Sequence, residues 1–175
     1  MAGMFLVGLI IYGFYYSTGY YYVEGLGYAI IQDILNHVLF NSKFLILLCL
    51  AKLLTTILTL SSGGSGGVFS PSLFMGATLG MAFGIFANHL ITQPLDNILF
   101  AVAGIAGLIA GTTGAIFTSI IFTIELTHDF NTTFVIILTA SVASLTRSIL
   151  LPGVNIYTAG LIQKHLNINL HRDSK

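Results

Sequence analysis

The stretch SSGGSGGVFSPS, residues 61–72, contains four glycines in five consecutive positions inside a long uncharged region. Glycine lacks a Cβ atom, so the backbone here can turn sharply and approach a ligand closely. A turn of this kind in front of an apolar segment has three interpretations: a phosphate-binding loop, a serine nucleophile, or an anion site at the start of a helix. The surrounding sequence distinguishes between them.

The chain is far more apolar than a water-soluble domain. Of its 175 residues, 55% are hydrophobic and 7% are charged, whereas a soluble domain carries roughly 25% charged residues. Between Lys52 and Asp96 only His89 has an acidic or basic side chain, and none lies between Asp96 and Glu125. Helices that face water need a polar stripe, which these segments lack. We therefore expect an integral membrane protein in a lipid bilayer. The net charge of zero gives no basic surface for nucleic acid.

The lengths of the apolar runs predict broken helices. A helix that crosses the hydrocarbon needs about 20 residues, and several runs have only 11 to 15. Short helices are tolerated in a bilayer where their freed backbone groups line a cavity or pack against protein. We predict an all-α integral membrane protein with multiple tilted, partly broken and re-entrant helices. The runs lie at about 4–23, 26–40, 43–60, 68–92, 97–110, 114–127, 130–151 and 156–166.

The domain organisation follows from the same pattern. No change of composition marks a second domain, so we assign residues 1–166 to one transmembrane domain and 167–175 to a short polar tail. Three positive charges lie at or after the end of the last apolar run: Lys164, Arg172 and Lys175. Because positive residues favour the cytoplasmic side, we expect the C-terminus to be cytoplasmic.

Two interpretations of the glycine stretch are weaker than the third. A P-loop needs G-x-x-x-x-G-K-[ST], and no lysine lies between Lys52 and Lys164. Residues 63–67, GGSGG, do fit the G-x-S-x-G pattern with Ser65 at its centre. An intramembrane serine protease would need a histidine base for Ser65, such as His89 or His128. So short a pattern arises easily by chance in a glycine-rich stretch. The protease is therefore the weaker interpretation, and we keep it as the alternative function.

The third interpretation suits the residues that follow. The glycines lead directly into a long apolar segment, VFSPSLFMGATLGMAFGIFANHL, residues 68–90. The first N–H groups of a helix lack partners inside the helix, and the helix dipole makes that end partly positive. Pro71 fits the first turn, where its missing N–H costs nothing. The segment therefore predicts an anion site, although a closely packed re-entrant turn would use the same residues.

Three segments resemble the chloride channel (CLC) family of anion channels and proton-coupled anion exchangers. The first is GGSGGVFSPSLFMGATLG, residues 63–80, which is similar to the family motif GGxFxPxLxxGxxxG. The second is FAVAGIAGLIAGTTGAIFTSIIFTIELTHDF, residues 100–130, which resembles a later pair of short helices that usually ends in E-[LM]-T. The third is NIYTAGL, residues 155–161, which resembles the last membrane helix. The resemblance extends in order over about residues 4–166.

The resemblance implies a chloride site at named positions. In the family, two backbone N–H groups at the start of the Gly-x-Phe-x-Pro helix hold the central anion, and the matching residues here are Val68 and Phe69, preceded by Gly67. A tyrosine hydroxyl also donates to the anion, and the matching residue is Tyr157. The implied anion-binding residues are thus Gly67, Val68, Phe69 and Tyr157. No catalytic residue, metal or cofactor is implied, and chloride is the transported substrate of a protein that is not an enzyme.

The resemblance also implies partners. The family fold consists of two inverted repeats, and this chain resembles the C-terminal repeat. The family's first-half motifs, GSGxP and GxEGP with its gating glutamate, do not occur in the sequence. We expect one repeat of a CLC-type fold with its N-terminal repeat missing, and a homodimer with contacts partly in 112–150. The expected function is chloride transport, as a voltage-gated-type channel or as a proton-coupled exchanger, and we expect the 175-residue chain not to conduct by itself.

Overall fold

The computed structural model describes residues 2–36, 38–63, 67–91 and 95–152. All regular elements in these ranges are helical. They are α1 (Ala2–Thr18), α2 (Tyr28–Leu35), α3 (Ser42–Ser61), α4 (Phe69–Asn88), α5 (Asn97–Thr113), α6 (Ile116–Thr127), the 3-10 turn η1 (Phe130–Thr132) and α7 (Thr133–Leu150). The prediction of an all-α membrane protein with partly broken helices is confirmed.

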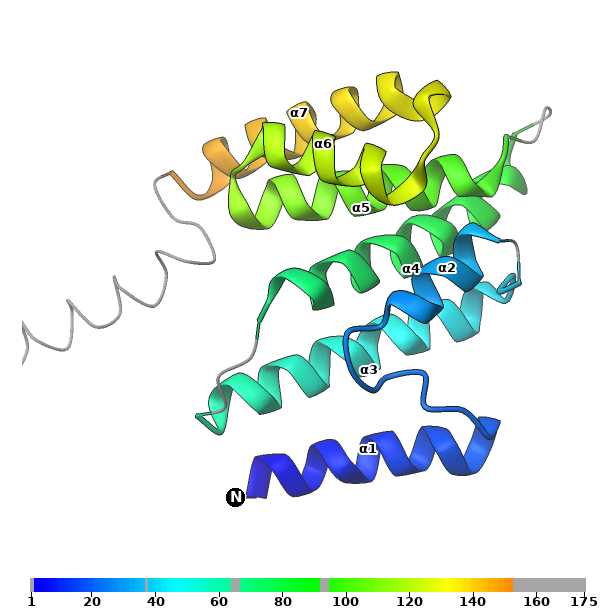
Figure 1. The fold of residues 1–175 in the computed structure, drawn as a ribbon, viewed down its shortest axis with the longest axis vertical. Coiled ribbons are helices and arrows are strands. Elements are labelled where there is room, and N and C mark those ends of the chain that lie inside the picture. The colour runs from blue at the N-terminus through cyan, green and yellow to red at the C-terminus, as the bar shows by residue number, and fades with distance from the viewer. Residues whose placement is uncertain (1, 37, 64–66, 92–94, 153–175) are drawn as a thin grey trace, which may run out of the picture.

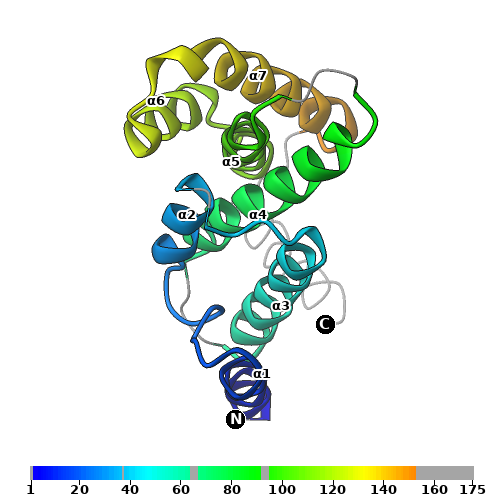
Figure 2. The ribbon, with the colours of Figure 1, turned by 90° about the vertical axis from the view of Figure 1, so that its right-hand side faces the viewer.

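The helices form a stack in which neighbours in the chain are mostly neighbours in space. Figures 1 and 2 show α1, α3, α4 and α5 following one another from one end of the stack, with α6 and α7 covering α5 at the other end. The short α2 lies against α4 and also touches α5. The central helix α4 therefore packs against α3 on one side and α5 on the other.

Three helices are long and apolar enough to cross a membrane by length and composition. They are Ser42–Ser61, Phe69–Asn88 and Phe130–Leu150, the last of which includes the 3-10 turn. Other apolar helices are shorter, down to the 12 residues of α6. The expected apolar run 4–23 becomes a helix only as far as Thr18, because Gly19 adopts a left-handed φ of 77° and ends it.

Glycines allow α4 and α5 to approach closely. Gly76, Gly80 and Gly84 repeat every fourth residue along α4, and Gly104 of α5 faces the first two of them. A Cβ atom at Gly76 would lie 2.6 Å from the Gly104 carbonyl oxygen and 2.8 Å from Ile105 Cα. Small residues at this spacing are typical of membrane helices whose backbones are in contact. The crossing fixes α4, and with it the segment that was predicted to bind an anion.

A polar clamp joins the end of α4 to the start of α5. The Asn88 amide nitrogen donates to the Leu95 carbonyl at 2.6 Å and to Asn97 Oδ1 at 2.7 Å, while Leu95 N–H donates to Asn88 Oδ1 at 3.0 Å. Asp96 then caps α5 by accepting from Ile98 N–H at 3.0 Å. These contacts satisfy backbone groups that would otherwise lack partners at a helix end.

Candidate functional site

The start of α4 has no side-chain cap. Val68 is the N-cap residue, with φ −91° and ψ −11°, and its apolar side chain accepts no hydrogen bond. Among the described residues we find no acceptor for the N–H groups of Val68 and Phe69. Pro71, in the first turn, contributes no donor. The first intrahelical donor is Ser72 N–H, which reaches the Val68 carbonyl at 3.2 Å. Within the described residues, the N–H groups of Val68 and Phe69, and also that of Ser70, thus lack an acceptor at the positive end of this helix.

Two contacts of α4 hold this end in position. The Phe69 ring meets the Phe122 ring of α6 edge-on, with 5.0 Å between centroids and an interplanar angle of 83°. The Ser70 hydroxyl donates to the Leu26 carbonyl at 2.6 Å. The second contact ties α4 to the segment before α2, 44 residues away in sequence. The start of α4 is thus fixed by α6 on one side and by residues 23–27 on the other.

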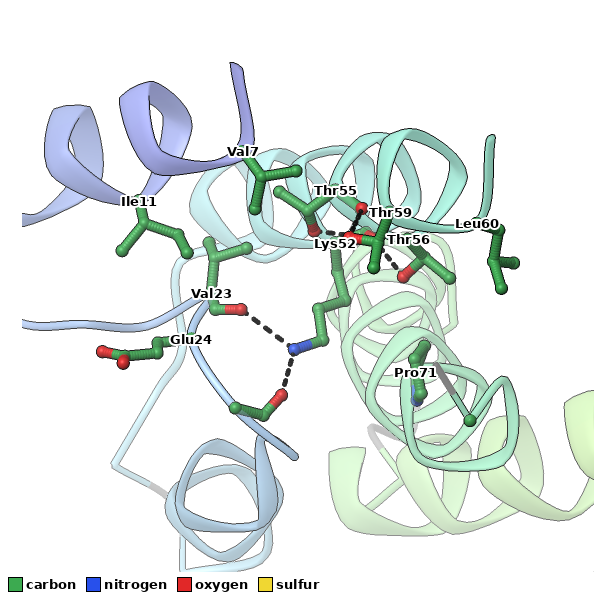
Figure 3. A pocket seen from close by; sticks show the side chains of 12 residues that line it. Val7, Ile11, Val23, Glu24, Lys52, Thr55, Thr56, Thr59, Leu60 and Pro71 are labelled. Carbon is green, nitrogen blue, oxygen red and sulfur yellow. Dashed lines mark hydrogen bonds between the residues drawn. The ribbon is translucent and has the colours of Figure 1, made fainter. Parts of the chain in front are cut away.

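Lys52 holds the same segment from α3. Its side chain is only 4% exposed, and its ammonium donates to the carbonyls of Val23 at 2.9 Å and Gly25 at 2.7 Å (Figure 3). The ammonium also lies 5.3 Å from the centre of the Phe74 ring of α4. We name residues 23–27 the strap, because Lys52 binds it to α3 and Ser70 binds it to α4.

The charge of Lys52 is not neutralised by a carboxylate in the described part of the chain. Glu24 lies between the two carbonyl partners in sequence, but it is exposed and its carboxylate points away from the ammonium (Figure 3). A lysine at the centre of a membrane helix costs about 2.5–3.5 kcal/mol to insert. The two carbonyls and the Phe74 ring offset part of that cost while leaving the positive charge in place.

A pocket of about 180 Å³ lies beside the start of α4 (Figure 3). Gly67, just before α4, and Pro71, in the first turn of α4, line it together with Lys52 of α3. Hydroxyl groups of Thr55, Thr56 and Thr59 add a polar surface, and each of them donates to a carbonyl of α3 itself. The remaining lining residues are Val7, Ile11, Val23, Glu24, Gly25 and Leu60. The pocket therefore combines a helix start with a buried cation.

The structure brings together three of the four predicted anion-binding residues. Gly67, Val68 and Phe69 are consecutive at the start of α4, with Gly67 in the pocket wall. Tyr157 lies outside the described residues, as does Ser65 of the alternative protease. The site itself stays a prediction.

Neither histidine considered for the protease lines the pocket at Gly67. His89 caps the far end of α4, and a 20-residue helix is about 30 Å long. His128 ends α6, where it adopts a left-handed φ of 53° and lines hollows with Glu125 rather than with Gly67. The described residues thus give no support to a histidine-activated serine.

Sequence reasoning did not identify the strap. In the apolar run 43–60, the sequence favours a Lys52 side chain that reaches the membrane surface over one that lines a polar crevice, and this expectation is wrong. The structure places it in the crevice. The sequence around Ser70, SPS, does not indicate which group its hydroxyl contacts, and a backbone carbonyl carries no sequence signal. The available signal was a lone lysine among apolar residues, which requires a buried partner of some kind.

Metal ligands do not gather in the part of the chain that the structure describes: no three His, Cys, Asp or Glu side chains lie together there.

Comparison with known proteins identifies one family. The sequence profile described as "Voltage gated chloride channel" matches residues 1–148. The "H(+)/Cl(-) exchange transporter ClcA" of Vibrio vulnificus strain YJ016 is 34% identical over 119 residues, which cover 67% of this chain and 25% of that protein. The protein of the same name from strain CMCP6 gives the same values. The chain spans about a quarter of the length of these curated relatives.

Proposed function

We propose that this chain, which belongs to the voltage-gated chloride channel family, forms part of a chloride pathway with an anion site at the start of α4. The observation that carries the proposal is the pair of open N–H groups of Val68 and Phe69, beside a pocket that Lys52 lines. The curated relatives are named as H(+)/Cl(-) exchange transporters, which supports chloride as the substrate. Both a channel and a proton-coupled exchanger are compatible with this site.

The site has too few donors to hold a dehydrated anion. Burying an isolated ion in a medium of low dielectric constant costs tens of kcal/mol by Born estimates, even though the effective cost in proteins is smaller. Hydrogen bonds to a charged group return about 1.5–3 kcal/mol each. The N–H groups of Val68 and Phe69, with the proposed Tyr157 hydroxyl, would return roughly 5–9 kcal/mol in total. Further donors are required, and we assign them to a first repeat, with residues 1–166 as the second repeat and 167–175 as its polar tail.

Lys52 adds a long-range contribution to this site. Its charge is buried, its two hydrogen bonds go to neutral carbonyls, and it shares the pocket wall with Gly67. Because charges interact more strongly where water is excluded, the ammonium raises the local potential for an anion that enters the pocket. Lys52 thus acts through its field, while the N–H groups of α4 make the contacts.

The exposed faces of α6 and α7 are the proposed dimer surface. Both carry large apolar side chains that the described residues do not cover: Phe117, Ile121, Phe134, Leu145 and Ile149 are each at least 64% exposed. Lipid or a second copy of the chain can cover such a surface. We assign it to a homodimer with contacts within 112–150 in the bilayer, and we place the C-terminal tail in the cytoplasm.

A proline substitution tests the anion site directly. Val68→Pro deletes one N–H donor at a position whose φ of −91° lies near the range of proline, whereas Val68→Ala keeps the donor. In the isolated chain the anion can keep part of its water shell, so we expect bromide, compared with gluconate at equal ionic strength, to raise the unfolding temperature of wild type and Val68→Ala but not of Val68→Pro. In crystals grown in bromide, anomalous density is expected beside Val68 and Phe69. Equal bromide stabilisation of all three proteins would contradict the site.

Transport by the isolated chain tests the need for a first repeat. Purified 175-residue protein in liposomes is expected to release no chloride above the level of empty vesicles. Selective chloride efflux that Val68→Pro abolishes would show that the chain supplies a complete pathway, and the donor count above would then be wrong.

A further inference from the structure

A second cavity is lined by residues on both sides of the strap and shares no lining residue with the pocket at the start of α4. It has a volume of about 390 Å³ and is lined by Tyr20, Tyr21 and Tyr22 together with Asp33 of α2. Ala29, Ile30 and Val38 complete the wall. We propose that this cavity binds an organic ammonium group, supplied by the headgroup of a zwitterionic phospholipid. The proposal is independent of anion transport.

Ring contacts give the tyrosines fixed positions. Tyr21 stacks on Tyr15 of α1, with centroids 4.5 Å apart and planes 13° from parallel. Tyr22 meets Phe44 of α3 edge-on at 5.3 Å, and Tyr20 lies 5.7 Å from Tyr22. Tyr21 and Tyr22 thus contact two helices directly, and Tyr20 contacts Tyr22. A cavity with anchored walls is preorganised, so a ligand need not order a loose segment when it binds.

Asp33 brings a negative charge to this cavity. Its side chain is half-buried, and within the described residues it makes no hydrogen bond or ion pair. His37, one turn further along, lies outside those residues. The π systems of the tyrosines attract cations and offer nothing to an anion. A carboxylate among three such rings therefore makes a local site for positive charge.

The chemistry of the wall selects the kind of cation. Calcium takes six to eight oxygen ligands, and magnesium requires near-octahedral oxygen coordination. One carboxylate and three phenol rings do not supply such a shell. A substituted ammonium is large, weakly hydrated and attracted to aromatic faces, and aromatic cages are the usual sites for choline-like groups. The composition of the wall thus favours an organic ammonium over a metal ion.

The position of the cavity indicates a lipid as the source. Phe44, the partner of Tyr22, is in the first turn of α3, and α3 is one of the helices long enough to span a membrane. The cavity is therefore at the level where a spanning helix leaves the hydrocarbon, which is the level of the headgroups and of interfacial tyrosines. Phosphatidylcholine and phosphatidylethanolamine present their ammonium groups at this depth.

The test measures contact between tyrosine rings and N-methyl protons. The full chain in a maltoside detergent is titrated with dihexanoylphosphatidylcholine, and saturation-transfer NMR irradiates the aromatic protons. We expect saturation of the trimethylammonium signal with wild type. Tyr20→Leu and Asp33→Asn should each weaken binding about three- to fivefold, whereas Tyr20→Phe, which keeps the ring, should bind within about twofold of wild type. Circular dichroism checks that each variant keeps its helices.

Matched controls separate this site from general lipid contact. Tyr16 is 83% exposed on α1 and does not line the cavity, so Tyr16→Leu should bind as wild type. Dihexanoylphosphatidylglycerol, which lacks an ammonium, should not compete. If tetramethylammonium competes as strongly as the lipid, the cavity does bind an ammonium group, but its ligand is a soluble cation and not a phospholipid headgroup. Equal binding of both lipids, or no effect of Asp33→Asn and Tyr20→Leu in folded protein, would overturn the proposal.

Discussion

Replacing Gly80 by alanine is expected to destabilise the fold by forcing α4 away from α5. A Cβ atom there would lie 2.9 Å from Ala101 Cα and from the Phe100 carbonyl carbon, and closer still to the Phe100 carbonyl oxygen. Because unstrained carbon contacts begin at about 3.5 Å, the backbones must separate by roughly 0.5–1 Å. Overpacking of this kind costs typically about 1–3 kcal/mol.

A second glycine provides the matched control. Gly8 lies in α1, and a Cβ there would meet nothing within 4 Å. Gly8→Ala should therefore only gain helix propensity, about 0.8–1 kcal/mol. Gly80→Ala gains the same propensity, so the difference between the two variants isolates the contact with α5 at about 1–3 kcal/mol. The two substitutions are expected to move stability in opposite directions when the overpacking exceeds the propensity gain.

Equilibrium unfolding measures this difference. Sodium dodecyl sulfate is titrated into the detergent-solubilised chain, and far-UV circular dichroism follows the helices. A double-mutant cycle adds a sharper test, because a Cβ at Gly104 would contact the Gly76 carbonyl oxygen and a Cβ at Gly76 would contact Gly104. Once one alanine has separated the helices, the second should cost less than it does alone. Additive effects, or a Gly80→Ala variant as stable as Gly8→Ala, would refute the proposed close crossing.

Two further predictions concern the strap. Lys52→Met removes both hydrogen bonds to residues 23–25, so protease cleavage after the exposed Glu24 should accelerate about tenfold or more. Its control is Lys43→Met, at an exposed position in the first turn of α3, which should leave the cleavage rate unchanged. Ser70→Ala removes one hydrogen bond to the strap and should accelerate the same cleavage about fivefold. Its control is Ser61→Ala, because the Ser61 hydroxyl forms a hydrogen bond only within α3. Equal cleavage rates in the two serine variants would contradict the role of Ser70.

The membrane class and the position of the central helix were predictable from the sequence, because both depend on local composition. Long stretches without charge required lipid or protein around them, and the glycines at 63–67 marked the boundary before α4. Pro71 indicated a first turn, and the helix does begin two residues earlier at Phe69. Asn41 and Asp96 are ordinary N-cap residues for α3 and α5, and their side chains act as such.

The strap was not predictable, because it depends on contacts between residues far apart in sequence. Lys52 reaches carbonyls 27 and 29 residues earlier, and carbonyls carry no sequence signal of their own. The start of α6 shows the same limit. Ile116 occupies the position at which a proline would favour a helix start, and the helix begins there because Gly114 turns with φ 77° and Thr113 Oγ1 accepts from Ala115 N–H at 3.1 Å.

The unprotected start of α4 is best understood together with the buried lysine. A serine, threonine, asparagine or aspartate in place of Val68 would typically add about 1 kcal/mol of stability by capping the helix, yet the chain has an apolar residue there. It also buries an ammonium near the same end, with no carboxylate partner in the described part of the chain, which a neutral side chain would avoid. Both departures raise the positive potential of one small pocket. A negatively charged guest relieves both at once. The starts of α2, α6 and α7 also lack a side-chain cap, so it is the combination with the buried Lys52, and not the missing cap alone, that leads us to assign the anion to this end of α4.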